Sequence, residues 1–227
     1  MPKREFFLLT KRAVDLIFSI VVIVGVLWWL TPILGILILI DSKGPIFFVQ
    51  SRDRRNRKPF PCLKFRTMWP NPEADTLQTQ PNDSRITRLG IYLRKSHLDE
   101  LPQFVNIFLG QMSLIGPRPH MHSDTHTYAP QIENYLTRLD VKPGFTGLAQ
   151  VNDLCGNTSN LHDMKARVRM DVFYVTHAGP SLDSVILWRS LQVMIRKFLG
   201  FLGVSRKPDP VVDLVPANSR SQSNKAV

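Results

Sequence analysis

The N-terminal part of the chain contains one long apolar run, residues 16–40, with 25 residues and no charged side chain. A straight α-helix of this length reaches roughly 38 Å, more than the roughly 30 Å of a bilayer's hydrocarbon core. The run is too long for the apolar part of a cleavable signal peptide, and no small-x-small cleavage site follows it before Asp41. We therefore expect a membrane-embedded helix, with a buried helix of a soluble core as the alternative.

Basic residues flank this run on both sides, which does not fit a simple crossing. Since positive flanks favour the cytoplasmic side, a straight span would place one cluster on the wrong side of the membrane. Thr31-Pro32 lies inside the run, where proline removes a helical hydrogen bond and kinks the helix. A helix that breaks there and returns would keep both flanks in the cytoplasm; a proline-kinked span is the alternative. The basic flanks are Lys3, Arg4, Lys11 and Arg12 before the run and Arg52, Arg54, Arg55, Arg57 and Lys58 after it.

The chain is strongly basic, because 29 Lys and Arg oppose 18 Asp and Glu and give a formal net charge of +11. This excess favours an anionic partner such as nucleic acid, acidic lipid or a phosphorylated substrate. The arginines are not interleaved with aromatic residues that would stack on bases, so we expect no nucleic-acid partner. Two cysteines, Cys62 and Cys155, exclude a disulfide-built secreted scaffold, and 227 residues suit one domain.

Beyond the apolar run, the sequence predicts a small β-hairpin followed by helices. Residues 45–50 and 60–66 are typical of short strands, and the basic stretch 52–58 between them is expected to be a loop. Residues 69–84, rich in Pro, Asn and Asp, predict a further loop. From Leu98 onward, apolar residues follow helical spacing.

Near the C-terminus, residues 182–202 mix apolar and basic positions. This pattern predicts an amphipathic helix, which either lies in the membrane interface or packs on the core as an ordinary surface helix. The Pro, Ser, Asn and Lys content from about residue 205 predicts a disordered tail. The expected fold is therefore mainly α-helical with one small β-hairpin.

The strongest candidate for chemistry is Asp99-Glu100, because Pro102 follows it closely. Proline suits the first turn of a helix, so the pair is expected at a helix N-terminus, where N–H groups and the helix dipole keep carboxylates ionised. Adjacent helical side chains point about 100° apart, so the two carboxylates cannot face each other as an acid/base pair. One of them could attack a substrate while the other holds a divalent cation. Alternatively, Asp99 only caps the helix and Glu100 complements its dipole.

Basic residues surround this pair in the sequence and suggest phosphate chemistry at a membrane. Arg118 stands between Pro117 and Pro119, which restrict the backbone and suit a guanidinium that clamps phosphate; a rigid turn with a solvated arginine is the alternative. Three histidines alternate over residues 120–126 as zinc ligands on a strand would, but we expect a polar surface loop there. The other nearby basic residues are Lys64, Arg66, Arg85, Arg88, Arg94 and Lys95.

In this order, the motifs resemble those of the monotopic phosphoglycosyl transferases, bacterial sugar transferases that start glycan assembly on polyprenyl phosphate. The likeness covers residues 10–204, and each motif alone is weak whereas the ordered set is specific. Its most specific stretch runs from Leu98-Asp99-Glu100-Leu101-Pro102-Gln103 to Gly116-Pro117-Arg118-Pro119. The other matches are Lys11-Arg12 with Asp15, Lys64-Phe65-Arg66-Thr67-Met68, Arg85-Ile86-Thr87-Arg88-Leu89-Gly90, Lys142-Pro143-Gly144-Phe145-Thr146-Gly147, Ala149-Gln150-Val151-Asn152, and Asp171 with Tyr174.

The resemblance implies that Asp99 attacks the β-phosphate of a UDP-sugar, releases UMP and carries the phosphosugar covalently. Undecaprenyl phosphate then takes the sugar phosphate from Asp99, while Glu100 binds Mg²⁺. It also implies a re-entrant helix broken at Thr31-Pro32. The residues expected to contact substrate phosphates are Lys64, Arg66, Arg88, Arg94, Arg118 and Gln150.

The same resemblance implies a monotopic protein in one leaflet of the bacterial inner membrane, at its cytoplasmic face. It divides the chain into a basic segment with the re-entrant helix (1–40), a catalytic domain (41–204) and a tail (205–227). The expected product starts the assembly of an exopolysaccharide, O-antigen or glycoprotein glycan, with downstream glycosyltransferases as partners and a homodimer as a further option. The alternatives are a membrane-tethered scaffold that kept the fold without catalysis and a tethered nucleic-acid binder.

Three positions depart from the family's usual pattern. Asp153-Leu154-Cys155 stand where Gly-Arg-Asn is common, Leu148 stands where tryptophan is usual, and Gln111 stands where an acidic residue is frequent. None of these changes falls on Asp99-Glu100. We therefore expect altered sugar selection rather than lost catalysis.

Overall fold

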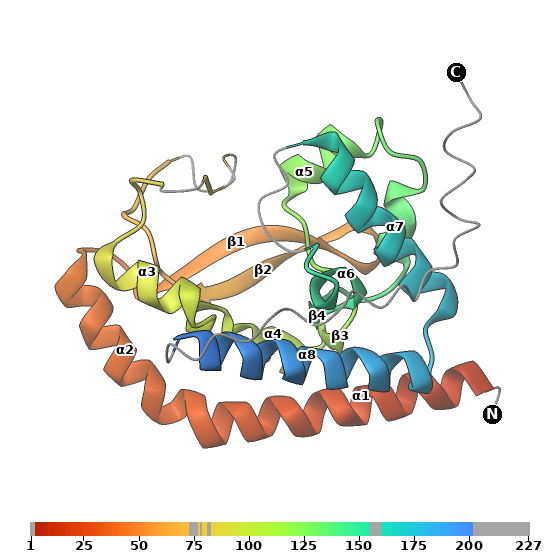
Figure 1. The fold of residues 1–227 in the computed structure, drawn as a ribbon. Coiled ribbons are helices and arrows are strands. Elements are labelled where there is room, and N and C mark those ends of the chain that lie inside the picture. Colours follow the sequence, from red (N-terminus) through yellow and green to blue (C-terminus); the bar gives the residue numbers. More distant parts are fainter. Residues whose placement is uncertain (1–2, 73–76, 78, 81–82, 155–159, 202–227) are drawn as a thin grey trace.

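The computed structural model describes residues 3–72, 77, 79–80, 83–154 and 160–201, in which helices predominate (Figure 1). The expected mainly helical fold with one antiparallel β-hairpin is confirmed. The expected tail, 205–227, lies outside the described residues. The helices are α1 (Lys3–Val22), α2 (Trp28–Asp41), α3 (Arg88–Lys95), α4 (Gln103–Phe108), α5 (His122–Tyr128), α6 (Leu148–Val151), α7 (Leu161–His177) and α8 (Pro180–Phe201), and the strands are β1 (Phe47–Arg54), β2 (Lys58–Phe65), β3 (Ser113–Ile115) and β4 (Gly144–Thr146).

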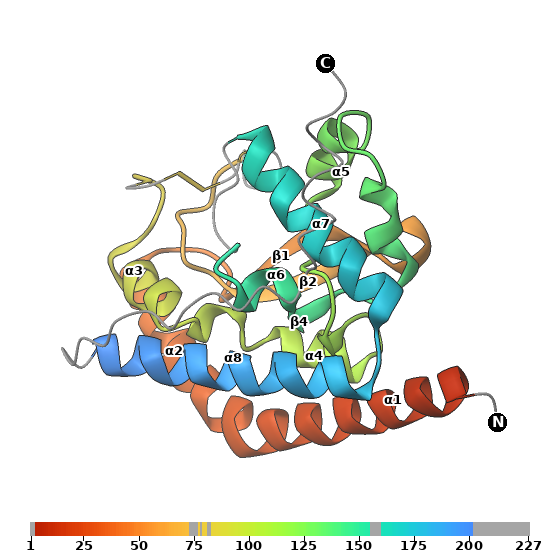
Figure 2. The ribbon, with the colours of Figure 1, turned by 45° about the vertical axis from the view of Figure 1, so that its right-hand side comes forward.

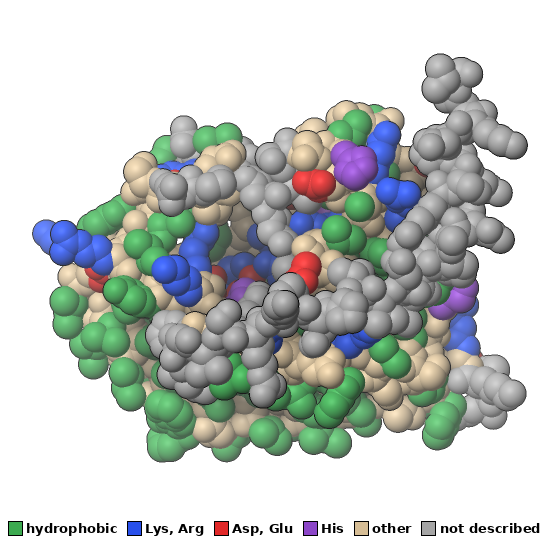
Figure 3. Space-filling view, viewed as in Figure 1, with side chains coloured by type: hydrophobic (Ala, Val, Ile, Leu, Met, Phe, Trp, Pro, Cys, Tyr) green, Lys and Arg blue, Asp and Glu red, His purple; other side chains and the backbone are tan. Residues whose placement is uncertain are grey.

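One long apolar helix, formed by α1 and α2, runs along the lower edge of the molecule in Figure 1. The helical stretch Arg4–Asp41 is long and apolar enough to cross a membrane, and only 17% of its most apolar window is buried. Figure 3 shows hydrophobic side chains along this edge. Exposed apolar surface of this extent favours contact with lipid over the alternative of a buried helix in a soluble core.

The helix does not break at Thr31-Pro32, because α2 runs through both residues. The irregular segment lies earlier, at Ile23–Leu27, which forms a π-helical turn closed by a bond from Trp28 N–H to the carbonyl of Ile23. The helix bends where α1 passes into α2 (Figure 1), as expected at a π-turn. Pro32 removes a single hydrogen bond, and the helix continues past it to Asp41.

The β-hairpin is longer than expected. Strands β1 and β2 pair antiparallel from Phe47 opposite Phe65 to Arg54 opposite Lys58, so the basic stretch 52–58 is largely strand rather than loop. The connection is a single 3₁₀ turn, Arg55–Arg57, in which Asn56 adopts a left-handed backbone with φ of 63°. Backbone pairing continues through the charged positions because their side chains extend to either side of a two-stranded ribbon.

Helix α1 is joined to the rest of the fold by polar contacts as well as apolar ones. The guanidinium of Arg12 donates to the carbonyls of Ile107 (2.7 Å) and Phe108 (2.8 Å), which lie at the C-terminal end of α4. Asp15 accepts hydrogen bonds from Leu114 N–H and the Ser113 hydroxyl at β3. The segment before the apolar run is therefore attached to the main domain by side-chain hydrogen bonds of Arg12 and Asp15.

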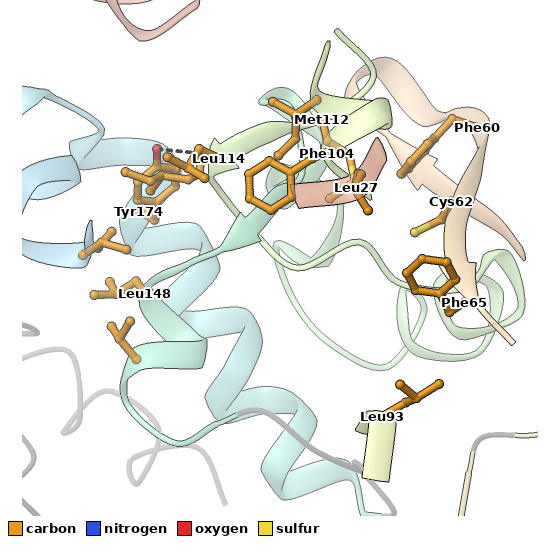
Figure 4. Packing of buried hydrophobic residues seen from close by; sticks show 14 of the residues in the cluster. Leu27, Phe60, Cys62, Phe65, Leu93, Phe104, Met112, Leu114, Leu148 and Tyr174 are labelled. Atoms are coloured by element: carbon orange, nitrogen blue, oxygen red, sulfur yellow. Dashed lines mark hydrogen bonds between the residues drawn. The ribbon is translucent and has the colours of Figure 1, made fainter. Parts of the chain in front are cut away.

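Three side chains of the membrane helix, Leu27, Leu34 and Ile38, belong to the main hydrophobic core. Figure 4 shows Leu27 among core residues contributed by other elements, including Phe104 and Met112. The membrane helix therefore contributes to the interior of the main domain, and burial of these side chains contributes about 2 kcal/mol each.

Strands β3 and β4 form a short parallel pair that the sequence pattern did not predict. The pair depends on glycine: a Cβ on Gly144 would lie 2.1 Å from the nitrogen of Gly116, and one on Gly147 would lie 2.1 Å from the Gly116 carbonyl oxygen. This close approach fixes the start of the Gly116-Pro117-Arg118-Pro119 segment.

The expected amphipathic helix over 182–202 is confirmed as α8, Pro180–Phe201. It runs beside α1 in the same direction (Figures 1 and 2), and Lys11 of α1 forms an ion pair with Asp183 of α8. Two large apolar side chains, Trp188 and Met194, are each 62% exposed. This exposed face suits a helix near the membrane surface.

Arg138 and Asp171 form a buried ion pair, with side chains 1% and 2% exposed, between the segment Tyr135–Asp140 and α7. We predict that Asp171→Ala lowers the free energy of unfolding by about 3–5 kcal/mol, because Arg138 would remain buried without its partner. Lys165→Ala, at an exposed position of the same helix, should stay within about 0.5 kcal/mol of the parent. Denaturant unfolding in detergent measures both; similar values for the two variants would contradict the prediction.

Candidate active site

Asp99 and Glu100 lie in a 3₁₀ turn, Leu98–Glu100, between α3 and α4. His97, just before this turn, adopts a left-handed backbone with φ of 58°, which redirects the chain after α3. Pro102 adopts helical angles at the cap of α4, as expected for proline at a helix start. The sequence therefore correctly placed the pair next to a helix N-terminus. Both carboxylates are buried, at 7% and 8% exposure.

Glu100 is held by two cations from different parts of the chain. Its Oε1 accepts from Lys64 Nζ of β2 and from Arg118 Nη2, both at 2.7 Å. Burial alone would raise the pKa of Glu100, but the charges of Arg118 and Lys64 and their hydrogen bonds hold it well below its usual range. Glu100 is therefore ionised and fixed, with Oε2 accepting only a long 3.4 Å contact from Arg118.

Asp99 is in the opposite situation. In the part of the chain that the structure describes, its carboxylate accepts no hydrogen bond. Burial raises the pKa of Asp99 to about 6, against the lowering charge of Lys64 and with a further raising effect of Glu100. A carboxylate that is ionised at neutral pH but poorly solvated and unpaired is suited to nucleophilic attack.

Two other arginines form hydrogen bonds with the backbone of the segment that carries Arg118. Arg138 donates to the carbonyl of Arg118 at 2.6 Å while it also binds Asp171, and Arg52 donates to the carbonyl of Pro119. Neither Arg52 nor Arg138 was identified as a site residue from the sequence. Arg52 stood in a basic stretch taken for a loop, and Arg138 had no motif to mark it.

The remaining residues that the sequence assigned to phosphate binding take different positions. Arg94 lines the cavity beside Asp99 and donates to the hydroxyls of Thr67 (2.8 Å) and Thr79 (3.1 Å). Gln150 also lines the cavity and donates to the carbonyl of Phe145.

The other two assigned arginines differ from these: Arg66 lines the cavity but binds backbone carbonyls, and Arg88 lies outside the cavity wall. The Arg66 guanidinium donates to the carbonyls of Ser42 and Lys43, at the end of α2. Arg88 is exposed at the start of α3 and is not part of the cavity wall. The contacts of Arg66 therefore fix the exit of the membrane helix.

A cavity of about 1810 Å³ connects the carboxylates to the membrane helix. Its wall includes Asp99 and Glu100 at one part and, elsewhere, apolar side chains of α1, the π-turn and α8 such as Phe18, Val26 and Leu187. Figure 3 shows a hollow near the centre of this face, with basic and acidic side chains at its bottom. One space thus offers both charged groups and an apolar wall.

The carboxylates of this site suit Mg²⁺ only if substrate phosphates supply further ligands. The described residues contain no group of three or more His, Cys, Asp or Glu that could hold a metal. Mg²⁺ commonly binds one or two carboxylates together with substrate phosphates rather than a full protein cage. The lightly bonded Oε2 of Glu100 fits this mode.

Two of the three alternating histidines, His122 and His126, lie in a helix, which corrects the expectation of a surface loop. Residues His122–Tyr128 are helix α5, and Asp124 accepts from Met121 N–H at its start. His120 precedes the helix and is buried at 4% exposure.

An apolar helix joined to a cavity with two carboxylates and several guanidinium groups defines a membrane-associated protein suited to phosphate-bearing ligands. Comparison with known proteins agrees: a family model described as "Bacterial sugar transferase" matches residues 6–197. The chain belongs to this family, as its motifs indicated.

Three curated relatives illustrate the likeness. The UDP-glucose:undecaprenyl-phosphate glucose-1-phosphate transferase of Klebsiella pneumoniae is 38% identical over 208 residues, which cover 90% of this chain and 43% of that protein. The protein of the same name in Escherichia coli (strain K12) is 40% identical over 199 residues, 86% of this chain and 40% of that protein. The exopolysaccharide production protein PSS of Rhizobium leguminosarum bv. phaseoli is 36% identical over 202 residues, 86% of this chain and 99% of that protein. The chain thus spans about two fifths of the first two relatives and nearly all of the third.

The departure at Asp153-Leu154-Cys155 is visible in part. Asp153 adopts a left-handed backbone with φ of 57°, a conformation that glycine, the family's usual residue there, adopts without strain. Its carboxylate lies 3.6 Å from the guanidinium of Arg196 on α8. Cys155 lies outside the described residues. The departure therefore adds a contact between the loop after α6 and α8.

The pKa of Asp99 can be tested without any assay of activity. Infrared difference spectra of protein carrying ¹³C-labelled aspartate, compared with Asp99→Asn, should show this carboxyl group half protonated near pH 6. Lys64→Met should shift that midpoint upward, because Lys64 exerts the largest lowering effect on Asp99. A midpoint near the ordinary value of an aspartate, or no shift in Lys64→Met, would contradict this account.

Proposed function

We propose that the chain transfers a sugar-1-phosphate from a UDP-sugar to undecaprenyl phosphate by two displacements at phosphorus. In the first, a carboxylate oxygen of Asp99 bonds to the β-phosphorus, the bond to the bridging oxygen breaks, and UMP leaves with that electron pair. In the second, an oxygen of undecaprenyl phosphate bonds to the same phosphorus and the bond to Asp99 breaks. The product is undecaprenyl diphosphosugar, and Asp99 is regenerated.

This proposal rests on one difference between the two carboxylates: Glu100 forms ion pairs, whereas Asp99 forms none with the described chain. Glu100 is compensated by Lys64 and Arg118, whereas Asp99 faces the cavity without a hydrogen bond from the described chain. Only an uncompensated carboxylate is free to form a bond to phosphorus. The printed names of the relatives support the donor and acceptor classes, since they act between UDP-glucose and undecaprenyl phosphate.

The cations around the pair have complementary roles in this reaction. Lys64, Arg94 and Arg118 would neutralise the charge that develops on the phosphate oxygens, a main source of catalysis in phosphoryl transfer. Gln150 offers an amide in the same wall. Magnesium bound by Glu100 and the substrate phosphates would supply further charge neutralisation.

We also propose that the protein sits in one leaflet at the cytoplasmic face of the inner membrane, with a re-entrant helix. The bend between α1 and α2 and the basic residues on both sides support this topology, since both flanks then remain in the cytoplasm. The exposed apolar face of α8 beside α1 would lie at the same membrane surface.

Asp99→Asn should reduce UMP release from a UDP-sugar by roughly 10³-fold or more, because the amide cannot act as the nucleophile. UDP-glucose, UDP-galactose and UDP-N-acetylgalactosamine serve as donors, with UMP measured in the presence of Mg²⁺ and undecaprenyl phosphate. Mass spectrometry of wild-type protein quenched with donor alone should detect a phosphosugar on Asp99.

Asp163→Asn is the matched control, because Asp163 is an exposed aspartate of α7 outside the cavity wall. It should release UMP at nearly the wild-type rate. Near-wild-type release by Asp99→Asn, or a wild-type protein that never carries the adduct, would refute the nucleophilic role.

The re-entrant topology predicts that cysteines at positions 3 and 43 are both shielded from outside the cell. Lys3→Cys and Lys43→Cys should therefore resist a membrane-impermeant maleimide in intact cells and react after permeabilisation. Reaction of either one in intact cells would show that the helix spans the membrane.

A further inference from the structure

The cavity wall also includes a second group of polar side chains, Arg52 and His120. Arg94 and Lys64 act electrostatically on Asp99, whereas Arg52 is influenced by Arg118 and Glu100. The cavity wall includes both groups. Arg52 and His120 lie outside the residues that the sequence motifs assigned to phosphate binding.

Arg52 is a partly buried cation with neutral hydrogen-bond partners. Its guanidinium donates to Gln50 Oε1 (2.6 and 3.1 Å) and to the carbonyl of Pro119, and it forms no ion pair with a carboxylate of the described chain. Burial lowers the pKa of Arg52, since the charged form is poorly solvated. Three of the five N–H groups of a guanidinium are thereby used, which leaves two for a ligand. An anion in the cavity would compensate this charge.

His120 adds an independent sign of a ligand at the same place. Its side chain is 4% exposed and lines the cavity. Its Nδ1 lies 2.7 Å from the Tyr135 hydroxyl, and its Nε2 has no hydrogen-bond partner in the described parts of the chain. When Tyr135 donates to Nδ1, the ring proton lies on Nε2, which then offers a donor to an anion.

The stereochemistry of phosphoryl transfer indicates which anion would bind beside Arg52 and His120. The attacking and leaving oxygens of such a displacement are roughly in line. If Asp99 attacks the phosphorus, the departing phosphate of UMP leaves on the opposite side. When undecaprenyl phosphate later displaces Asp99, its phosphate must approach from that same side. Both groups are phosphate monoesters.

We propose that Arg52, Arg118 and His120 form a subsite for a phosphate monoester, which holds the phosphate of UMP as it leaves and then the phosphate of the lipid acceptor as it attacks. This inference rests on the proposed function. It explains why a partly buried arginine on the hairpin strand β1 binds the backbone beside Arg118 and still has donors left.

Binding to the full-length Asp99→Asn protein in detergent tests the subsite without chemistry. The probes are UMP and farnesyl phosphate, measured by calorimetry separately and in competition. Each should exclude the other, and Arg52→Met in this background should weaken both by about tenfold or more, the effect of losing a charged hydrogen bond. Simultaneous binding of the two probes, or a loss of affinity for only one of them, would overturn a shared subsite.

Two comparisons separate the subsite from general damage. Arg169→Met removes an exposed guanidinium of α7 outside the cavity wall and should leave both affinities unchanged; an equal loss would overturn the assignment to Arg52. His120→Phe keeps a ring beside Tyr135 and the Arg52 contact with Pro119, so it tests the site even if Arg52→Met unfolds. It too should weaken both probes, and unchanged affinities would overturn the proposal.

This test is distinct from that of the proposed function. The covalent phosphosugar on Asp99 in wild-type protein reports the reaction, whereas monoester binding to Asp99→Asn reports the subsite. A protein that binds both probes competitively but never forms the adduct would refute the reaction and keep the subsite. A protein that forms the adduct but binds both probes at once would do the reverse.

Discussion

The site depends on how differently two neighbouring carboxylates are compensated. Glu100 shares one oxygen between Lys64 and Arg118, so its charge is neutralised inside the protein. Asp99 has no such partner, and burial raises its pKa to about 6. Keeping it ionised at neutral pH costs about 3 kcal/mol relative to an ordinary aspartate. In the proposed reaction, a bond from Asp99 to phosphorus would remove this uncompensated charge.

Much of the positive charge has a structural use that the net charge alone does not reveal. Four arginines donate to backbone carbonyls at the boundaries of the site: Arg12 at the end of α4, Arg66 at the end of α2, Arg52 at Pro119 and Arg138 at Arg118. These bonds fix the C-terminal ends of α2 and α4 and the segment that carries Arg118. An excess of basic residues in a membrane-associated chain therefore serves the internal frame as well as an anionic partner.

The parts that the sequence could predict are those whose physics is local. The apolar run, the hairpin and the position of Asp99-Glu100 beside Pro102 follow from composition and neighbouring residues, and the structure confirms them. The ion pair of Glu100 with Lys64, 36 positions away, depends on tertiary packing that no spacing rule specifies. The same limit explains the unforeseen parallel strands.

The errors have a similar origin. A break was expected at Pro32, but the helix tolerates that residue and deforms at the Ile23–Leu27 turn instead. The basic stretch 52–58 was expected to be a loop, yet strand pairing continues through most of it, and Arg52 binds the backbone of the Arg118 segment. Charge and proline content indicate the local structural preference of a segment. In both cases the structure depended instead on the residues that the segment contacts or adjoins.

The participation of the membrane helix in the core limits how the molecule can be divided. Leu27, Leu34 and Ile38 pack in the interior, while Arg12 and Asp15 satisfy backbone groups of α4 and β3. A fragment starting after α2 would lose these side chains, leaving an open apolar hole and unsatisfied polar groups in its interior. The apolar helix and the main domain are therefore not separable modules of this chain, and a version without the helix would require redesign of its interior rather than simple truncation.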